Sequence, residues 1–251
     1  MKNITLPKNY MIARYIHLTG KLSELPAVTR GVHKGGLVYR VRSGGRIRIF
    51  KESSENGVKA GEIYRLRERI TAMLNGLRSS FEDIDTVASA FRIERYKELK
   101  LGSDFYRNAV QDSSPYRNRN KYVLNGVNYR SRVELMIAQV LTDLGLEFKY
   151  DCDISCSGIT YTVDFLVYLP EFGRCFMIEY LGRLDDEGYV HKNSIKIRDY
   201  LSNGYYFGTD LLILCGNEFQ MPTVGQIRGE ILHMLDTISS AHLTRENAFV
   251  F

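Results

Sequence analysis

The apolar runs YTVDFLVYL (161–169) and RCFMIEYLG (174–182) decide the fold of the second half of this 251-residue chain. Both are typical of short β-strands. Asp164 interrupts the first run, and Glu179 stands near the end of the second. Carboxylates are seldom placed inside hydrophobic segments unless they are paired or bind a metal. The two residues therefore mark a candidate site.

A third acidic residue, Glu134, lies in the apolar stretch SRVELMIAQVLTDLG (131–145), which has the periodicity of a helix. On such a helix Glu134 shares a face with Ile137 and Leu141, so its side chain should point toward the core. The three carboxylates then follow the order helix, strand, strand, with 15 residues from the second to the third.

The elements around these carboxylates predict an α/β fold in which helices flank a mixed β-sheet. A helix over about 131–144 is expected to end at Gly145. Strands are expected at about 147–152, 160–168, 174–181 and 210–215, and further helices at about 186–202 and 224–237.

The formal net charge of +5 is unevenly distributed. Residues 1–130 hold 25 of the 34 Lys and Arg residues but only 12 of the 29 Asp and Glu residues. A basic half joined to an acidic half predicts one part that binds a polyanion, nucleic acid being the obvious one, and one part with another task. The break at Ser113, Ser114 and Pro115 places the junction between a basic region, 1–125, and a second domain, 126–251.

The basic region is expected to be α+β. The segment GGLVYRVRSGGRIRIFKE (35–52) alternates like a β-hairpin whose one face carries four arginines, and helices are expected at about 59–79 and from Ser80 to about Lys100. Such a ribbon can lie along a phosphate backbone or enter a major groove. A later stretch interleaves tyrosines with cations, which also suits nucleic acid. The candidate nucleic-acid-binding residues are Arg40, Arg42, Arg46, Arg48, Arg117, Arg119 and Lys121.

Residues 130–237 resemble the PD-(D/E)xK nuclease superfamily, in which a core helix carries a Glu and the next two strands carry an Asp and a Glu or Asp. Those places fall on Glu134, Asp164 and Glu179. The resemblance implies a restriction-endonuclease-like fold and hydrolysis of phosphodiester bonds, in DNA rather than RNA. It also implies that Asp164, Glu179 and Glu134 hold Mg²⁺ or Mn²⁺, for which carboxylate oxygens are suitable ligands.

One position departs from the superfamily pattern, because Leu181 stands where a Lys usually follows the last acidic residue. The segment IEYLG is similar to a variant in which the basic role moves to the next helix. Lys192 and Lys196 are four residues apart there and share a face, so either is a candidate catalytic residue. His191 is a weaker candidate.

Two other readings stay open beside the nuclease. The missing Lys also suits a nucleic-acid-binding protein whose nuclease-like domain is inactive, and the basic half also suits an assembly factor that meets an acidic partner. A homodimer, or a partner protein in a larger nucleoprotein complex, fits a coordinated cut of both strands.

The cysteines and the hydropathy indicate a cytoplasmic protein that does not enter a membrane. No uncharged stretch approaches the roughly 20 residues that a membrane helix needs. Cys152, Cys156, Cys175 and Cys215 form no CxxC pair, which fits a reducing compartment. Cys175 and Cys215 lie in apolar runs and are expected to be buried.

Overall fold

The computed structural model describes residues 6–96, 99–111, 122–217 and 219–246. By compactness these residues form two units. One unit holds residues 6–10 and Ile93–Thr244, and the other holds Met11–Arg92 with residues 245–246. Composition and compactness thus divide the chain at different places, near residue 125 and after Arg92. The larger unit is called the sheet unit below, and the smaller one the basic unit.

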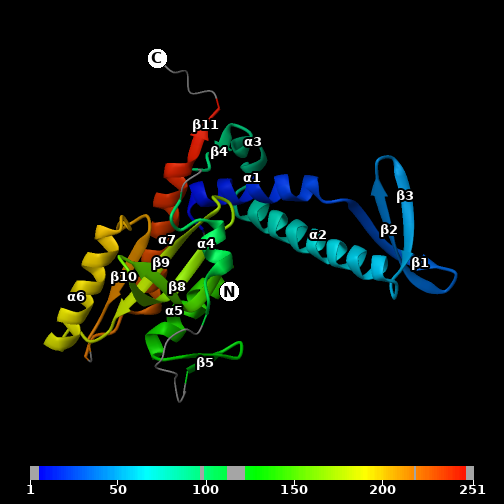
Figure 1. Ribbon diagram of the computed structural model, residues 1–251. Coiled ribbons are helices and arrows are strands. Elements are labelled where there is room, and N and C mark those ends of the chain that lie inside the picture. Colours follow the sequence, from blue (N-terminus) through cyan, green and yellow to red (C-terminus); the bar gives the residue numbers. More distant parts are fainter. Residues whose placement is uncertain (1–5, 97–98, 112–121, 218, 247–251) are drawn as a thin grey trace. The chain divides into compact units, whose positions relative to one another are not determined.

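The sheet unit is built on a four-stranded mixed sheet in the order β10-β9-β8-β7 (Figure 1). The strands β7 Glu147–Cys156, β8 Ile159–Leu169 and β9 Arg174–Leu181 are antiparallel neighbours, and β10 Leu211–Cys215 runs parallel to β9. Ser157 and Gly158 join β7 to β8 with φ angles of 52° and 81°, as a two-residue hairpin turn requires. The mixed α/β class predicted for this half is confirmed.

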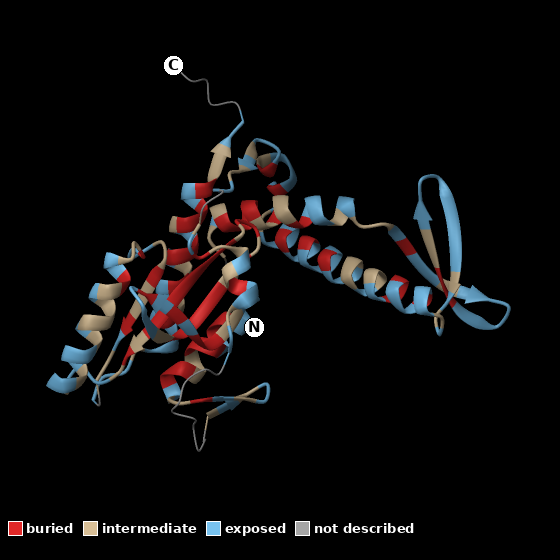
Figure 2. Ribbon diagram, in the orientation of Figure 1, coloured by how far each residue is buried: buried red, intermediate tan, exposed pale blue. Residues whose placement is uncertain are grey.

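Helices cover both faces of this sheet. Tyr106 of α4 (Ser103–Asn108) and Tyr200 of α6 (Glu187–Ser202) join Met177 and Leu211 in one buried cluster. The helices α5 Arg132–Asp143 and α7 Val224–His242 pack together on the other side (Figure 1). Because both faces are covered, β9 is buried along nearly its whole length and β8 is largely buried from Val163 onward (Figure 2). Their sequences accordingly show apolar runs without alternation.

The helices of this unit begin where their sequences provide caps. Ser131 accepts the backbone N–H of Glu134 ahead of α5, and Asp186 accepts that of Tyr189 ahead of α6. Thr223 and Gln226 form a capping box at the start of α7. Gly145 adopts φ 64° just after α5, the usual way a helix stops. The three helices predicted here are present, and α7 continues to His242.

The basic unit contains a three-stranded antiparallel sheet in the order β1-β2-β3. Its strands are β1 Ala27–His33, β2 Gly36–Ser43 and β3 Arg46–Lys51. The β2–β3 hairpin is confirmed, and both turn residues, Gly44 and Gly45, have positive φ. The helix α2 Glu55–Ser80 packs its Ala60 against Val28 and Tyr39 of the sheet. The helix α1 Lys8–Glu24 contributes its residues 11–24 to this unit.

The expectation that all four hairpin arginines share one face is wrong. In the β2–β3 register, Arg42 lies opposite Ile47 and Arg40 opposite Ile49, whereas Arg48 lies opposite Val41. Opposite residues of an antiparallel pair share a face. Each even-numbered residue of β2 pairs with an odd-numbered residue of β3. The even-numbered arginines of β2 therefore lie on the opposite face from the even-numbered arginines of β3. Arg40 and Arg42 are on the outer face, and Arg46 and Arg48 are on the face that meets α2.

The helix predicted from Ser80 to about Lys100 is also wrong. The described residues of this segment form only the short helix α3 Ile84–Ala88, followed by the strand β4 Phe91–Ile93. The Asp85 carboxylate accepts hydrogen bonds from Arg78 (3.0 Å) and from the hydroxyl of Tyr15. These side-chain contacts hold the segment against α2 and α1, so it does not continue as a long helix.

Several further elements have no counterpart in the predictions. They are α1, β1, α4, β5 Tyr122–Leu124, β6 Val127–Tyr129 and β11 Leu243–Arg245. Among the described residues, no helix has both the length and the apolar character needed to cross a membrane.

Candidate functional site

The sheet unit brings the three predicted carboxylates into one region. Glu134 lies in the first turn of α5, Asp164 in β8 and Glu179 in the adjacent strand β9. Their residues are only 6%, 7% and 3% exposed. The backbone N–H of Tyr180 donates to Asp164 Oδ2 at 2.7 Å, which holds the Asp164 side chain toward β9 at the level of Glu179. Three largely buried carboxylates in one small region require cations or hydrogen bonds beside them.

Arg130, just ahead of α5, supplies one of these cations. Its Nη2 lies 2.6 Å from Asp164 Oδ1 and 2.9 Å from Asp151 Oδ1, and its Nε lies 3.7 Å from Glu134 Oε2. Burial alone lowers the pKa of the guanidinium, but Asp164, Glu134 and Asp151 outweigh it and raise the pKa above its usual value. Arg130 therefore stays charged and links three carboxylates from three elements.

Asp151 is a fourth carboxylate of this region, and the sequence reasoning missed it. Simple alternation along β7 assigns Asp151 to the same outward face as Asp153. Asp153 is exposed, but Asp151 is 5% exposed. The difference arises because Asp151 adopts φ 52°, which breaks the alternation of the strand and turns its side chain inward. Aspartate tolerates this conformation better than most residues.

Glu134 is fixed by hydrogen bonds to one of its oxygens. Its Oε2 accepts the backbone N–H of Arg130 at 2.9 Å and the hydroxyl of Tyr150. Burial raises the pKa of Glu134, the nearby charge of Asp164 raises it further, and Arg130 opposes the shift. Burial and Glu134 also raise the pKa of Tyr150, so this hydroxyl keeps its proton and acts as a donor.

Lys196 of α6 reaches the third carboxylate. Its Nζ lies 2.6 Å from Glu179 Oε1 and donates to the carbonyl of Thr162 at 2.8 Å. The Tyr200 hydroxyl donates to the same Glu179 oxygen at 2.8 Å. Lys192 and His191, by contrast, are exposed and form no ion pair with any residue that the structure describes. Of the two lysine candidates, the structure brings only Lys196 to the carboxylates.

The environment of Glu179 makes the stability of the metal-free protein depend on pH. Burial raises the pKa of Glu179 to about 7 from a usual 4.5, although Lys196 opposes the shift. An acid with a raised folded-state pKa stabilises the fold below its unfolded pKa, and this contribution is lost as the pH rises through the folded pKa.

We therefore expect the free energy of unfolding in EDTA to fall between about pH 4.5 and pH 7, by on the order of 3 kcal/mol. Glu179→Gln should flatten this part of the profile because it removes the titrating group. Urea unfolding followed by circular dichroism at several pH values measures both curves. The same slope in wild type and variant would assign the pH dependence to other groups.

The oxygen atoms of these carboxylates are suitable ligands for a divalent metal, but they are not arranged as a complete coordination site. Carboxylate oxygens are the ligands that Mg²⁺ and Mn²⁺ prefer, and Asp151 and Asp164 already converge on the single positive charge of Arg130. Within the described ranges, however, no three His, Cys, Asp or Glu side chains are grouped so that they could hold a metal ion. Arg130 and Lys196 stand among the carboxylates, so a metal would have to share or replace these contacts.

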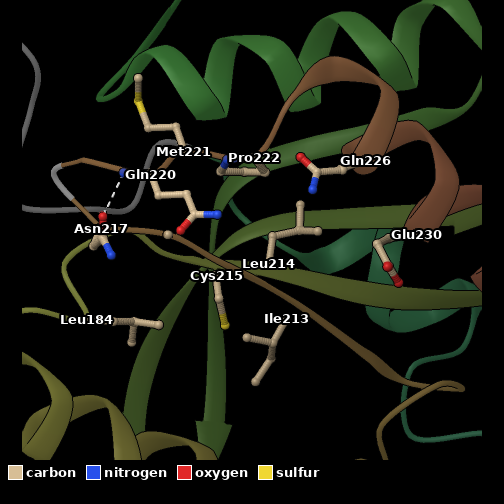
Figure 3. A pocket seen from close by; sticks show the side chains of 11 residues that line it. Leu184, Ile213, Leu214, Cys215, Asn217, Gln220, Met221, Pro222, Gln226 and Glu230 are labelled. Atoms are coloured by element: carbon tan, nitrogen blue, oxygen red, sulfur yellow. Dashed lines mark hydrogen bonds between the residues drawn. The ribbon is translucent and has the colours of Figure 1, made fainter.

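A pocket of about 400 Å³ in the same unit is lined by other residues than these carboxylates. Its lining residues include Leu184, Cys215, Met221 and Glu230 (Figure 3). Cys215 is exposed, which corrects the expectation of a buried thiol; as the last residue of β10 it emerges at the strand end. Cys152, Cys156 and Cys175 are buried, the last as predicted.

The predicted nucleic-acid-binding residues fall into two groups. Arg40 is half-buried, and Arg42, Arg46 and Arg48 are exposed on the sheet of the basic unit. Arg117, Arg119 and Lys121 lie outside the described residues.

Comparison of the chain with protein-family models, with curated proteins and with solved structures finds no match. The functional argument therefore depends on the residues themselves and on the pattern that they form.

Proposed function

We propose that this chain is a metal-dependent nuclease that hydrolyses phosphodiester bonds, in DNA rather than RNA. The observation that carries the proposal is the gathering of Glu134, Asp164 and Glu179 where the pairing of β8 with β9 ends, with Lys196 against Glu179. The element order and the acidic residues resemble the PD-(D/E)xK superfamily, and the mixed sheet between helices is compatible with a restriction-endonuclease-like fold.

Asp164 and Glu179 would hold Mg²⁺ or Mn²⁺, with Glu134 and Asp151 as further oxygen donors. Such an ion, when bound, activates a water molecule and neutralises negative charge on the phosphate. The chain's own residues position these donors: the Tyr180 N–H fixes Asp164, and Tyr150 with the Arg130 backbone fixes Glu134.

Lys196 takes the catalytic role that Leu181 cannot fill. In the usual pattern the Lys follows the last acidic residue on the same strand, whereas here the ammonium reaches Glu179 from α6. A lysine beside a carboxylate can orient a water molecule and stabilise negative charge that develops on a phosphate. Its hydrogen bond to Thr162 keeps it in this place.

The basic unit would supply most of the affinity for nucleic acid, since residues 131–251 hold more acidic than basic residues. Residues 27–51 contain seven Lys and Arg and no Asp or Glu. Binding that depends on such cations weakens steeply with salt. A second copy of the chain, or a partner protein, would be needed for a coordinated cut of both strands.

The substrate class is tested by incubating the full chain with end-labelled single-stranded DNA, duplex DNA and RNA, in Mg²⁺, in Mn²⁺ and in EDTA. The proposal predicts cutting of DNA that either metal supports and that EDTA stops. Cutting of RNA alone would keep the metal-dependent chemistry but overturn the preference for DNA.

A second candidate function is nucleic-acid binding by a protein whose nuclease-like unit is inactive. The observation that favours it is that Arg130 and Lys196 already neutralise the carboxylates. Thermal unfolding separates the two candidates, because a ligand that binds only the folded state raises the melting temperature.

For the nuclease we expect Mg²⁺ or Mn²⁺ at ~100 times its Kd to stabilise wild type by about 2.7 kcal/mol. This stabilisation, measured as a rise in melting temperature, should be lost in Asp164→Asn. An equal, negligible response of wild type and variant to both metals would favour the inactive unit.

A further inference from the structure

The outer face of the three-stranded sheet in the basic unit combines charge with exposed apolar side chains. Val28, Tyr39 and Phe50 pack the other face against α2. On the outer face, Arg42 stands opposite Ile47 and Arg40 opposite Ile49. Ile47 and Ile49 are 55% and 49% exposed. Two neighbouring exposed isoleucines opposite two arginines are unusual for a face that meets only water.

Cations outnumber acidic residues in this sheet, and few of them form ion pairs with described residues. Residues 27–51 contain no Asp or Glu. Arg30 pairs with Glu52 at 3.1 Å, but Arg42 forms no ion pair with any described residue. Uncompensated charges of one sign attract a polyanion.

Arg40 lies flat against the outer face. A Cβ placed on Gly31 would come within 2.3 Å of the Arg40 guanidinium, so this guanidinium crosses strand β1 where no side chain stands. Its Nη2 lies 3.5 Å from the carbonyl of Val32. Gly31 of β1 thus leaves room for the Arg40 guanidinium on this face. The exposed side chains of Arg42, Ile47 and Ile49 lie beside it on β2 and β3.

We propose that the β2–β3 ribbon binds duplex DNA through this outer face, with Arg40 and Arg42 on phosphates and with Ile47 and Ile49 against apolar base edges. A two-stranded ribbon fits the major groove of B-form DNA. The thymine methyl group there offers an apolar contact. Duplex RNA has a deep, narrow major groove that side chains cannot read, so the same surface should bind it less well.

This inference deepens the proposed function, because it names duplex DNA as the partner of the basic unit, but it does not depend on cleavage. Binding of the full chain to a labelled DNA duplex is therefore measured in EDTA over a range of salt concentrations. Failure to cut DNA would leave the binding result intact, and failure to bind would leave the carboxylate chemistry to be judged by cleavage alone.

The face is tested with two matched pairs of substitutions on the same hairpin. Arg40→Ala with Arg42→Ala should reduce the slope of log affinity against log salt by about 2, one for each phosphate contact. Arg46→Ala with Arg48→Ala, on the opposite face, should change it by less than about 1. Equal or larger effects of the second pair would overturn the assignment of the outer face.

The isoleucines give a second, independent readout. Ile47→Ser with Ile49→Ser should lower the affinity for duplex DNA at least about fivefold without changing the salt slope, because the lost contacts are apolar. The same pair should have little effect on duplex RNA. An unchanged DNA affinity in this variant would overturn the groove-binding mode, and no salt-dependent DNA binding by wild type would favour an acidic protein as the partner. Circular dichroism checks that each variant is folded.

Discussion

Arg130→Met is expected to lower the free energy of unfolding by about 3–5 kcal/mol in the absence of metal. The substitution leaves Asp151 and Asp164, which are 7% and 10% exposed as side chains, without the cation that bridges them. Buried charges that lose their partner cost far more than an exposed pair gains. Urea unfolding followed by circular dichroism measures the change.

Arg132→Met is the matched control, because Arg132 lies two residues later at the start of α5 and is exposed. Its effect should stay within about 0.5 kcal/mol. A loss below about 1 kcal/mol for Arg130→Met would show that the carboxylates do not need this cation.

Divalent metal should raise the melting temperature of Arg130→Met more than that of wild type. This gain is expected if Mg²⁺ can take the charge-neutralising place of the guanidinium. Arg130→Met without this gain would mean that Arg130 is a structural ion-pair partner and that the metal is held elsewhere.

Lys196→Met is expected to reduce the rate of metal-dependent cleavage by about 10²–10⁴, the usual effect of removing a group that transfers or orients protons. The ammonium lies 2.6 Å from Glu179 Oε1, so its loss also changes the charge beside that carboxylate. Single-turnover cleavage of saturating labelled DNA measures the rate. The melting temperature is recorded beside it, to separate catalysis from folding.

Lys192→Met is the control on the same helix, one turn before Lys196. Lys192 is exposed, so its substitution should leave the cleavage rate within about a factor of two. Equal losses in the two variants would mean that the charge of α6 matters as a whole. A loss confined to Lys192→Met would contradict the assignment of Lys196.

The four strands of the sheet unit's main sheet, and the carboxylates Asp164 and Glu179 within them, were predictable because their signals are local. The runs of β8 and β9 are apolar without alternation, and an acidic residue inside such a run stands out. Asp151 gave no such signal, since only its positive φ turns it inward. Nothing near Arg130 in sequence distinguishes it from an exposed arginine, because its partners come from α5, β7 and β8.

Long-range packing and pairing register explain the other differences. Spacing placed Lys192 and Lys196 on one face of a helix, but only the position of α6 against the sheet selects Lys196. The face of each hairpin arginine depends on which residues pair across the turn. Because Arg42 pairs with Ile47 and Ser43 pairs with Arg46, Arg42 and Arg46 lie on opposite faces. Alternation within each strand does not contain that information.

The measurement that tests the central claim most directly is cleavage of end-labelled DNA by wild type, Asp164→Asn and Glu179→Gln, each with Mg²⁺ and with EDTA. The carboxylate site predicts that wild type cuts only with Mg²⁺ and that both folded variants lose the activity. Cutting that persists equally in both variants, or a folded wild type that binds DNA and leaves it intact with Mg²⁺ and with Mn²⁺, would contradict the account.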